Sequence, residues 1–552
     1  IDPISRVTGS CSLLVHPESN TRVLVDCGAY QGIGAAELND KPFLFDPKTI
    51  DWLLLTHAHF DHCGRIPALV DQGFRGTILC TRETWALARV VLKDSLHIQA
   101  RTDLLWTLDA VKVQFFGSRL FTKPWTLAED LCVTPHRSAH ILGAVGFEVC
   151  WYRDSRRRSI LFTGDLGSNQ RGERDQPLLD HRMVPRDRAD FMVLESTYGA
   201  RKRLRMSAAQ RRKALRIAVT DGLQRGGPVI LPTFSIHRLQ ELLYDLHVLQ
   251  WEDPAFMHEV PLLVDSRMGE TACGVMAEHL TRSFVSSRGK SRKAWLGRQV
   301  YEDFGLDRLN PTHVRAMDAL LRAVFSGTCA VDTDEDGELV QLQPMWRSAR
   351  SWDRENARNC VVLTSSGMCS AGPVVPWLAA NLRRPEASVY LSGYCTESTV
   401  GGHLLRIAEQ SPTERALNQV PLPFNGDTVV VGHEVRAVVG RLEGYSGHAD
   451  QTSLVDHVFG RTMGDDQRTA STVVLNHGDD GARRDLAAAI AERADALGQS
   501  VRVMVPRRED PGLDLDTGRP LSRAEVLGEV LAPSTAEIVE GAQYVQGLED
   551  AL

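Results

Sequence analysis

The first 200 residues contain short apolar runs, each closed by polar residues. Four of these runs end in an acid or in a group of histidines: residues 23–26, 51–57, 160–165 and 191–195. Apolar runs of this length, bounded by turn residues, are typical of buried strands. Layered α/β folds carry their chemistry at the carboxyl ends of such strands, so we expect a functional site where these ends meet.

From about residue 206 the pattern changes to an alternation of helix and strand. Helices are expected at residues 206–225 and 237–250, and strands at residues 228–232, 260–265, 360–363 and 388–391. This order is typical of a doubly wound parallel sheet, which would form a second domain. Residues 286–350 are polar and charged, and they predict helices but no clear strand, so we interpret them as an elaboration of that domain.

After Gly426 short β-type runs return, at residues 428–431, 435–442 and 472–475. We therefore expect the first domain to resume there and the second domain to be an insertion within it. The expected division is residues 1–197 and 441–508 for the first domain, residues 198–440 for the insertion, and residues 509–552 for an acidic, partly helical tail.

The bulk composition is that of a soluble globular protein of two or three domains, with 552 residues, 43% of them apolar and 24% charged. No window approaches the roughly 20 apolar residues of a membrane-spanning helix. The start, Ile1–Ser5, has neither a basic segment nor an apolar signal core, and it lacks an initiator Met, so the natural N-terminus can lie upstream. The eleven cysteines form no CxxC pair, which favours reduced thiols in a cytoplasmic protein.

The net charge of −7 argues against a uniformly basic surface for nucleic acid. Basic residues nevertheless cluster at residues 201–216, which contain eight lysines or arginines and no acid, and again at residues 288–298. Such clusters are either solvated faces or surfaces that meet RNA, and both readings stay open. Residues 509–552 carry ten acids against two arginines.

The segment Thr56–His62, with the sequence THAHFDH, packs three histidines and an aspartate into six positions. Imidazole suits zinc, and a carboxylate adds a charge-neutralising ligand. On extended backbone His57 and His59 point to the same side. The turn that follows brings Asp61 and His62 to a neighbouring position, so one loop can serve two adjacent ions. A lone histidine is more often a core or surface residue, but four ligand-type side chains together favour a metal site.

Such a loop supplies only part of a binuclear site, so further ligands are expected at other strand ends. His140, within Arg137–Ala144, and Asp165, within Thr163–Gly167, are candidates, and a carboxylate is well suited to bridge two cations. With these residues in this order the chain resembles the metallo-β-lactamase superfamily. The resemblance implies an α/β fold in which two sheets form an αββα sandwich.

The long stretch after Glu195–Gly199 resembles the insertion of the β-CASP nucleases, which include RNA 3′-end-processing endonucleases and RNase J. The resemblance covers residues 4 to about 506. The matching positions are Gly9–Cys11, Asp26, Glu195, His448 within Ser446–Asp450, His477 within Leu475–Gly478, and, in the insertion, residues 231–241, 365–368 and 393–401. Three features depart from the family pattern: Ser138–Ala139 before His140 in place of Gly, Arg267 in place of Pro, and the longer 286–350 stretch. None of them removes a ligand, so they bear on the substrate path and on partner surfaces.

The resemblance implies two zinc ions as cofactors and a two-metal hydroxide mechanism for phosphodiester hydrolysis. One ion would be held by His57, His59, His140 and Asp165. The other would be held by Asp61, His62, Asp165 and His477.

The resemblance also implies roles for residues beyond these ligands. His448 would be the general acid, and Glu195 would orient it and favour its protonated form. Asp26 would support the ligands from behind, and Asp61 is counted with the catalytic residues. Two plainer readings stay open: Glu195 and His448 as a structural pair, and Asp26 as a turn-capping acid.

Three residues of the insertion are expected to hold the phosphate backbone of the substrate: Arg238, Ser366 and Thr399. For Ser366 the alternative is a helix N-cap before Gly367. Because His477 stands where the DNA-repair branch typically carries Val, the resemblance favours RNA.

We therefore expect a zinc-dependent ribonuclease that acts on single-stranded RNA, in processing or degradation. The alternatives are a DNA-cleaving nuclease of repair or defence, a non-catalytic scaffold subunit, and a hydrolase of small esters or lactams. No membrane contact is expected. A homodimer and a protein partner bound through the tail or through residues 286–350 stay open, as does endonucleolytic against 5′-exonucleolytic cleavage.

Overall fold

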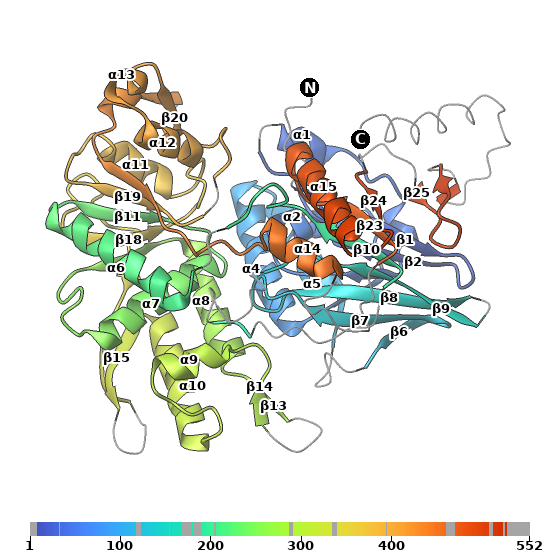
Figure 1. Ribbon diagram of the computed structural model, residues 1–552. Coiled ribbons are helices and arrows are strands. Elements are labelled where there is room, and N and C mark those ends of the chain that lie inside the picture. The colour runs from blue at the N-terminus through green and yellow to red at the C-terminus, as the bar shows by residue number, and fades with distance from the viewer. Residues whose placement is uncertain are drawn as a thin grey trace.

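The computed structural model describes most of the chain between residues 8 and 526 (Figure 1). The described residues are 8–32, 34–116, 123–153, 155–167, 178–180, 189–203, 206–285, 291–333, 339–393, 395–425, 427–459, 470–506, 512–522 and 525–526. Most of the expected acidic tail lies outside them. The part of the tail that is described contains the short hairpin of β25 (Gly512–Leu513) and β26 (Pro520–Leu521).

Two sheets form the metallo-β-lactamase sandwich. The first consists of β1 (Ser12–His16), β2 (Thr21–Val25), β3 (Trp52–Leu54), β4 (Thr77–Cys80) and β5 (Lys112–Phe115), in that order. The second consists, in order across the sheet, of β24 (Arg502–Met504), β23 (Thr472–Asn476), β10 (Phe191–Glu195), β9 (Arg156–Phe162), β8 (Val145–Arg153), β7 (Leu131–Arg137) and β6 (Trp125–Ala128). Apolar side chains of both sheets, such as Leu53 and Phe147, share one buried core.

Helices cover the outer faces of this sandwich. Those of the first sequence segment are α1 (Ala35–Asp40), α2 (Phe60–Cys63), α3 (Ile66–Asp71), α4 (Arg82–Ile98) and α5 (Thr107–Ala110). After the insertion come α14 (Gln451–Phe459) and α15 (Asp480–Ala496), which pack on β10 and β23. The αββα arrangement expected from the sequence is therefore confirmed.

The two ends of the first domain meet in a single pair of strands. β10 and β23 are parallel neighbours, with Glu195 opposite Asn476. The chain therefore leaves the first domain at the carboxyl end of β10, forms the inserted domain, and returns through α14 to β23. The carboxyl end of β23 leads into His477 at the same edge.

The inserted domain has a six-stranded, all-parallel sheet of order β17-β12-β18-β11-β19-β22. In that order the strands are β17 (Arg347–Ser348), β12 (Leu262–Asp265), β18 (Cys360–Thr364), β11 (Pro228–Pro232), β19 (Ser388–Leu391) and β22 (Val438–Arg441). One face carries α6 (Ala208–Gln224), α7 (Arg238–Glu252) and α8 (Arg267–Leu280), and the other carries α11 (Val374–Asn381) and α12 (Val400–Glu409). The doubly wound sheet is thus confirmed.

Two expectations about strands are wrong. In the 286–350 elaboration lie the described helices α9 (Arg298–Asp303) and α10 (Pro311–Ser326). It also contributes the second strand of the hairpin β13–β14 (Ser283–Val285 and Ser291–Lys293) and both strands of the hairpin β15–β16 (Thr328–Thr333 and Leu339–Pro344). Each hairpin pairs only with itself, so its strands lack the long apolar run that marks a core strand.

The first domain also does not resume at residue 428. There the hairpin β20–β21 (Gln419–Pro423 and Asp427–Val431), which follows the short helix α13 (Pro412–Arg415), packs on α12, and β22 completes the inserted sheet. A β-rich run does not reveal which sheet it joins, because pairing partners are set by tertiary contacts. The chain returns to the first domain only after Arg441.

Contacts between α4 and α8 join the two domains. Arg267, the first residue of α8, donates to Asp94 over 2.8 Å, and Nδ1 of His279 lies 3.3 Å from Oε1 of Glu83. Arg267, which departs from the family pattern, thus has a role at this junction. Among the helices that the structure describes, none is both long and apolar enough to cross a membrane.

Candidate metal centre

The histidine-rich loop follows β3, whose last residues are buried in the core. Its backbone is still extended at His59, which is the N-cap of α2, and the helix begins at Phe60. The change from strand to helix sends His57 and His59 to one side and places Asp61 and His62 on the first turn of the helix. The local structure thus divides the four side chains between two positions, as the spacing predicts.

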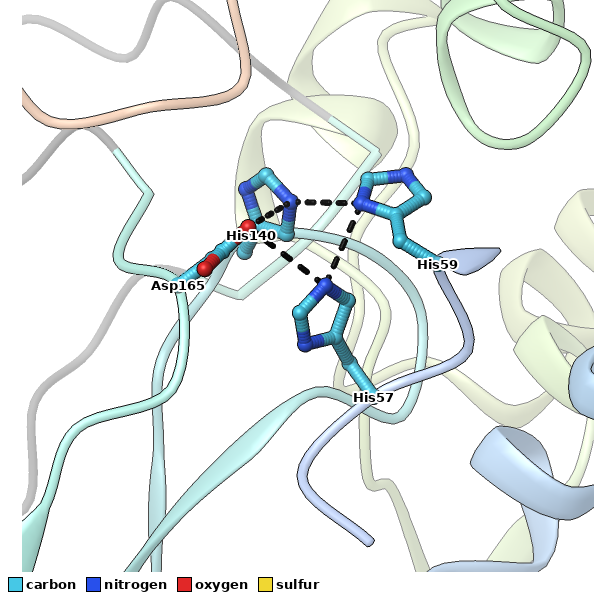
Figure 2. A group of neighbouring side chains, drawn as sticks. All are labelled: His57, His59, His140 and Asp165. Carbon is cyan, nitrogen blue, oxygen red and sulfur yellow. Dashed lines mark hydrogen bonds and ion pairs between the residues drawn. The ribbon is translucent and has the colours of Figure 1, made fainter. Parts of the chain in front are cut away.

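Four ligand atoms converge at the first position (Figure 2). Nδ1 of His59 lies 3.2 Å from Nε2 of His57 and 3.0 Å from Nε2 of His140. Oδ2 of Asp165 lies 3.5 Å from Nε2 of His57 and 3.4 Å from Nε2 of His140. Zinc–ligand bonds of about 2.0–2.1 Å separate the ligands of a tetrahedral ion by about 3.3 Å. These four atoms therefore have the spacing of a tetrahedral zinc site.

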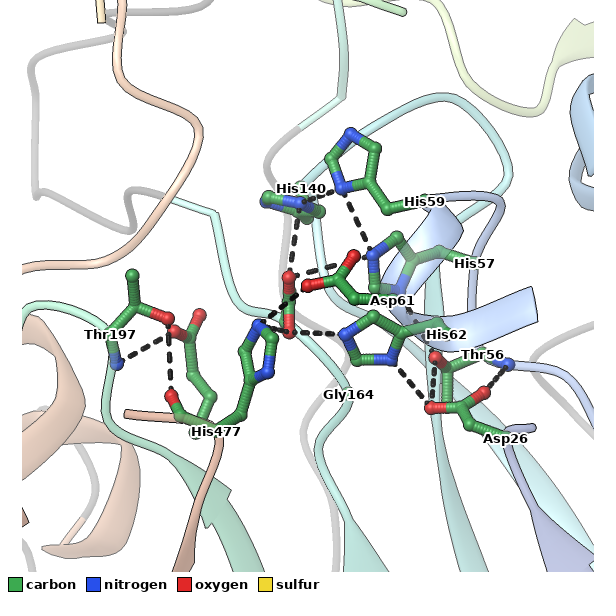
Figure 3. A network of polar contacts seen from close by, with 12 residues as sticks. Asp26, Thr56, His57, His59, Asp61, His62, His140, Gly164, Thr197 and His477 are labelled. Carbon is green, nitrogen blue, oxygen red and sulfur yellow. Dashed lines mark hydrogen bonds and ion pairs between the residues drawn. The ribbon is translucent and has the colours of Figure 1, made fainter. Parts of the chain in front are cut away.

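Asp61, His62 and His477 form the second position (Figure 3), which uses the other oxygen of the Asp165 carboxylate. Oδ1 of Asp165 lies 3.2 Å from Nε2 of His62 and 3.3 Å from Nε2 of His477. Oδ2 of Asp61 completes the group, 3.6 Å from Nε2 of His477. Asp165 therefore offers one oxygen to each group, which is the arrangement that a carboxylate bridging two cations requires.

The protonation of the first group suits a metal. Burial lowers the pKa of His57 and of His140 well below the ordinary value, and it lowers the pKa of His59 to about 4. All three rings are therefore neutral at pH 7 and carry a lone pair. Neutral imidazole is the form that binds zinc, so no proton has to be removed from these rings first.

Unpaired buried atoms show that the second group also fits a cation. Nε2 of His62 and Oδ1 of Asp165 are buried and form no hydrogen bond. Burial opposes a charge on His62, but the carboxylates of Asp165 and Asp26 outweigh it and raise the pKa of His62 well above its ordinary value. Buried polar atoms normally have partners, and a bound ion is one explanation when they do not. The residues therefore fit a divalent cation here.

Asp26 supports the ligand loop from behind. Its Oδ2 lies 2.7 Å from Nδ1 of His62 and accepts a hydrogen bond from Oγ1 of Thr56 over 2.9 Å, and its Oδ1 accepts from the Thr56 backbone N–H over 2.8 Å. A carboxylate on one imidazole nitrogen fixes the ring and leaves the other nitrogen for a metal. Thr56, which the sequence marked only as a strand end, is thus part of the site.

His448 and Glu195 form a second pair beside the ligands. Nδ1 of His448 lies 3.1 Å from Oε2 and 3.3 Å from Oε1 of Glu195. Glu195 is buried at the end of β10, and the backbone N–H of Leu166 also donates to it over 2.6 Å. His448 is held on this side only through Nδ1, and its side chain is 21% exposed, so its ring can reach a substrate.

Two glycines let the ligand loops approach one another, and no pattern in the sequence pointed to their role. A Cβ on Gly28 would lie 1.6 Å from the carbonyl oxygen of Asp61. A Cβ on Gly167 would lie 1.9 Å from the carbonyl oxygen of Ala139, the residue before His140. Only glycine allows backbones this close.

Arg238 is the one expected phosphate contact that has free donors. Its Nε and Nη1 are buried without a hydrogen-bond partner, and its guanidinium lies against Gly447, beside His448. Burial lowers the pKa of Arg238 to about 10, so it is still charged at pH 7. An unpartnered charge of this kind is suited to an anionic ligand.

The hydroxyls of Ser366 and Thr399 already have partners within the chain. Thr399 is the N-cap of α12: it accepts from the Gly402 N–H over 3.2 Å and donates to the carbonyl of Thr396. Ser366 donates to the carbonyl of Ala371 over 3.1 Å. It is no helix N-cap, because the next helix, α11, begins only at Val374, so that alternative is wrong.

The basic cluster at residues 201–216 divides between arginines that pair with acids and side chains that are exposed. Its helical arginines point inward or pair with acids: Arg211 with Asp245, Arg212 with Asp303 and Arg216 with Asp253. Arg201, Lys202 and Lys213 are exposed, and Arg205 lies outside the described residues, as do Arg288, Lys290 and Tyr394.

Comparison with known families divides the chain into three matches. Residues 5–214 match the metallo-beta-lactamase superfamily, and residues 239–404 match the Beta-Casp domain. Residues 432–506 match the family described as a Zn-dependent metallo-hydrolase RNA specificity domain.

Curated relatives cover most of this chain. Ribonuclease TTHA0252 of Thermus thermophilus is 30% identical over 480 residues, which are 86% of this chain and 91% of that protein. Transcription termination factor FttA of Methanothermobacter thermautotrophicus is 25% identical, over 87% of this chain and 66% of its own length. Endoribonuclease ysh-1 of Neurospora crassa is 26% identical, over 74% of this chain and 44% of its own length. The chain thus spans nearly all of the first relative, but less than two thirds of the other two.

Proposed function

Because this chain belongs to the β-CASP family of the metallo-β-lactamase superfamily, we propose that it is a metal-dependent ribonuclease that hydrolyses phosphodiester bonds of single-stranded RNA in the cytoplasm. The observation that carries the proposal is the geometry around Asp165. Two groups of ligand atoms share its carboxylate, and the His448–Glu195 pair stands beside them. Hydrolysis of small esters or lactams would not explain the presence of the large inserted domain.

Zinc is the metal that the donor set favours. Three neutral imidazoles and one carboxylate oxygen at tetrahedral spacing match the ligands and geometry of protein zinc sites. The second group, formed by Asp61, His62, His477 and the shared Asp165, would hold the second ion. Two adjacent divalent cations polarise a phosphoryl oxygen and lower the pKa of water, which is the chemistry that phosphodiester hydrolysis needs.

The protein's own contribution to the reaction is proton transfer and substrate placement. With Nδ1 engaged by Glu195, the ring of His448 has Nε2 left to give a proton to the 3′ oxygen that departs. The contact of Glu195 with Nδ1 fixes the orientation of the ring. Arg238 would hold a backbone phosphate through its two free N–H groups, which places the chain of the substrate against Gly447.

Strand cleavage with end-labelled substrates tests this function. The zinc-loaded protein is incubated with an RNA and a DNA of the same sequence, and with 5′- and 3′-labelled RNA that carries either a 5′-phosphate or a 5′-hydroxyl. We expect RNA cleavage that a chelator abolishes and zinc restores. Cleavage of DNA alone would replace the proposal with a DNA nuclease, and the pattern of labelled products separates internal cutting from stepwise removal at the 5′ end.

A His448→Ala variant controls for a contaminating nuclease. It keeps all seven ligands, so it should bind metal as the parent protein does while cleaving RNA about 100-fold or more slowly. Unchanged cleavage by this variant would show that the activity does not come from this site.

A further inference from the structure

The chain between β22 and α14 crosses from the inserted domain to the first domain and carries His448 (Figure 1). Four consecutive residues of this crossing each bind a different element. Tyr445 binds Asp245 over 2.6 Å, Ser446 binds Tyr198 over 2.7 Å, the Gly447 carbonyl lies 2.8 Å from Nδ1 of His140, and His448 binds Glu195 over 3.1 Å. Asp245, the partner in the first of these contacts, lies on α7 of the inserted domain, whereas His140 and Glu195 lie in the first domain.

This first contact belongs to a fully buried polar cluster between α6 and α7. The hydroxyl of Tyr445 donates to Oδ2 of Asp245, and Nε of Arg211 donates to the same oxygen over 2.7 Å. Nη2 of Arg211 donates to Oε2 of Glu241 over 3.1 Å, and the guanidinium stacks on the Tyr445 ring at 4.6 Å. All four side chains are 1% exposed or less. Such a cluster has one arrangement, because any displacement leaves a buried charge without a partner.

The backbone next to the cluster is equally constrained. Gly444 has φ 88, and a Cβ there would lie 3.0 Å from Cγ of Arg211. The backbone at Gly444, just before Tyr445, is therefore packed directly against the side chain of Arg211. Three residues span at most about 10 Å, so a shift of Tyr445 is passed on to His448.

We propose that Tyr445 is a positioning residue: its hydrogen bond to Asp245 fixes the crossing segment and thereby sets His448 for proton transfer to the departing oxygen. The inference rests on the proposed function. It gives the inserted domain a part in the chemistry as well as in substrate binding. The plainer alternative is that the cluster only stabilises the fold.

A matched pair of variants separates these readings. Tyr445→Phe removes only the hydroxyl that Asp245 accepts. Tyr244, the residue before Asp245 on α7, is also buried, and its hydroxyl donates to Asp303. Tyr244→Phe therefore removes a phenol–carboxylate hydrogen bond in which the crossing segment takes no part. Both variants lose one buried phenol–carboxylate hydrogen bond, so thermal unfolding should report similar losses of stability.

The readout is the dependence of kcat on the leaving group. Each protein cleaves an RNA with an ordinary 3′ oxygen at the scissile bond and the same RNA with sulfur in place of that oxygen. A thiolate leaves without protonation, so loss of the general acid lowers kcat for the oxygen substrate more than for the sulfur substrate. His448→Ala defines the full change in the oxygen-to-sulfur ratio of kcat, since general acid catalysis is worth about 100-fold or more.

We expect Tyr445→Phe to lower this ratio by about tenfold, in line with the cost of a small misplacement of a catalytic group, and Tyr244→Phe to leave it unchanged. Asp245→Asn, which removes the charge from the acceptor, should lower the ratio in the same direction. If His448→Ala lowers the ratio but neither Tyr445→Phe nor Asp245→Asn does, the positioning role is wrong and the proposed function stands. If His448→Ala leaves the ratio unchanged, His448 is not the general acid and the positioning role fails with it. Absence of RNA cleavage by the zinc-loaded parent protein is the result that would overturn the proposed function.

Discussion

The carboxylate of Asp26 lies 2.7 Å from Nδ1 of His62, and the other ring nitrogen of His62, Nε2, faces Asp165. This contact orients a ligand without touching the metal position. Asp26→Ala should therefore weaken zinc binding at the second group by about 10- to 100-fold, the usual cost of losing such a support. Zinc titration against a competing chelator measures the change.

The control for Asp26 is Asp51→Ala. Asp51 accepts a backbone hydrogen bond from Arg22 over 2.9 Å at the opposite end of the same strands, and its loss should leave zinc affinity as it is. Equal affinities in the Asp26→Ala variant and the parent protein would instead support the plainer reading of Asp26 as a turn-capping acid.

The number of metal ions bound per chain should differ between a variant of Asp165, which both groups share, and a variant of His477, which belongs to the second group alone. His477→Ala leaves the first group complete, so about one ion per chain should remain after dialysis. Asp165→Asn weakens both groups and should leave less metal than His477→Ala does. Elemental analysis of the dialysed variants gives the stoichiometry, and the opposite order of the two variants would contradict a bridging role.

Gly28→Ala should damage the ligand loop. The added methyl group would lie 1.6 Å from the carbonyl of Asp61, and overpacking of this kind costs about 1–3 kcal/mol or more. Gly274→Ala is the matched control, since this exposed helical glycine of α8 has nothing within 4 Å of its Cβ position. There the same change should stabilise by up to about 1 kcal/mol through helix propensity. Urea unfolding measures both, and a harmless Gly28→Ala would show that the loops can move apart.

Glu241 should make the folded protein less stable at alkaline pH. Burial raises the pKa of Glu241 to about 8 in the fold, against an ordinary value near 4.5. The folded state therefore keeps a proton that the unfolded chain has already lost, and stability falls as the pH rises toward 8. One such proton contributes a slope of about 1.4 kcal/mol per pH unit.

The variant Glu241→Gln isolates this slope, because the amide imitates the protonated acid. The unfolding free energies of the parent protein and of Glu241→Gln are compared at pH 6 and pH 8. The parent should lose stability relative to the variant between these two values. A constant difference would mean that Glu241 is already ionised in the folded protein.

Arg238→Met should separate stability from binding. Because two buried N–H groups of Arg238 have no partner, removal of the charge should leave the free energy of unfolding unchanged or increase it. RNA affinity of the metal-free protein, measured by fluorescence anisotropy, should fall by about tenfold with the loss of one phosphate contact. An unaltered affinity would assign Arg238 to the fold alone.

The ligand loop could be predicted from sequence because its information is local. Six positions contain His57, His59, Asp61 and His62, and a strand that passes into a helix sorts them without help from the rest of the chain. His140 and Asp165 could be expected at other strand ends, since the carboxyl ends of strands in a layered fold gather at one edge. His477 was expected because its position matches a motif of the β-CASP family.

Residues that act through tertiary contacts left no comparable signal. Arg211 stands in a row of basic residues that resembles a solvated face, and only the packing of α6 on α7 buries it beside Asp245. Tyr445 is a single tyrosine in a loop, and only its packing against the inserted domain buries it beside Asp245. The strands of the two hairpins at the 286–350 elaboration were missed for a related reason: they pair only within their hairpins and need no apolar core.

The pairing of β10 with β23 has a consequence for the synthesis of the protein. Glu195 and His477 become neighbours only when a strand made late in translation joins one made early, with the whole inserted domain between them. The second metal position and the His448 pair therefore cannot form on a chain that is still short of those residues. Until those residues have been made, the nascent polypeptide lacks part of the candidate site, and it gains that part only after the whole inserted domain has been synthesised.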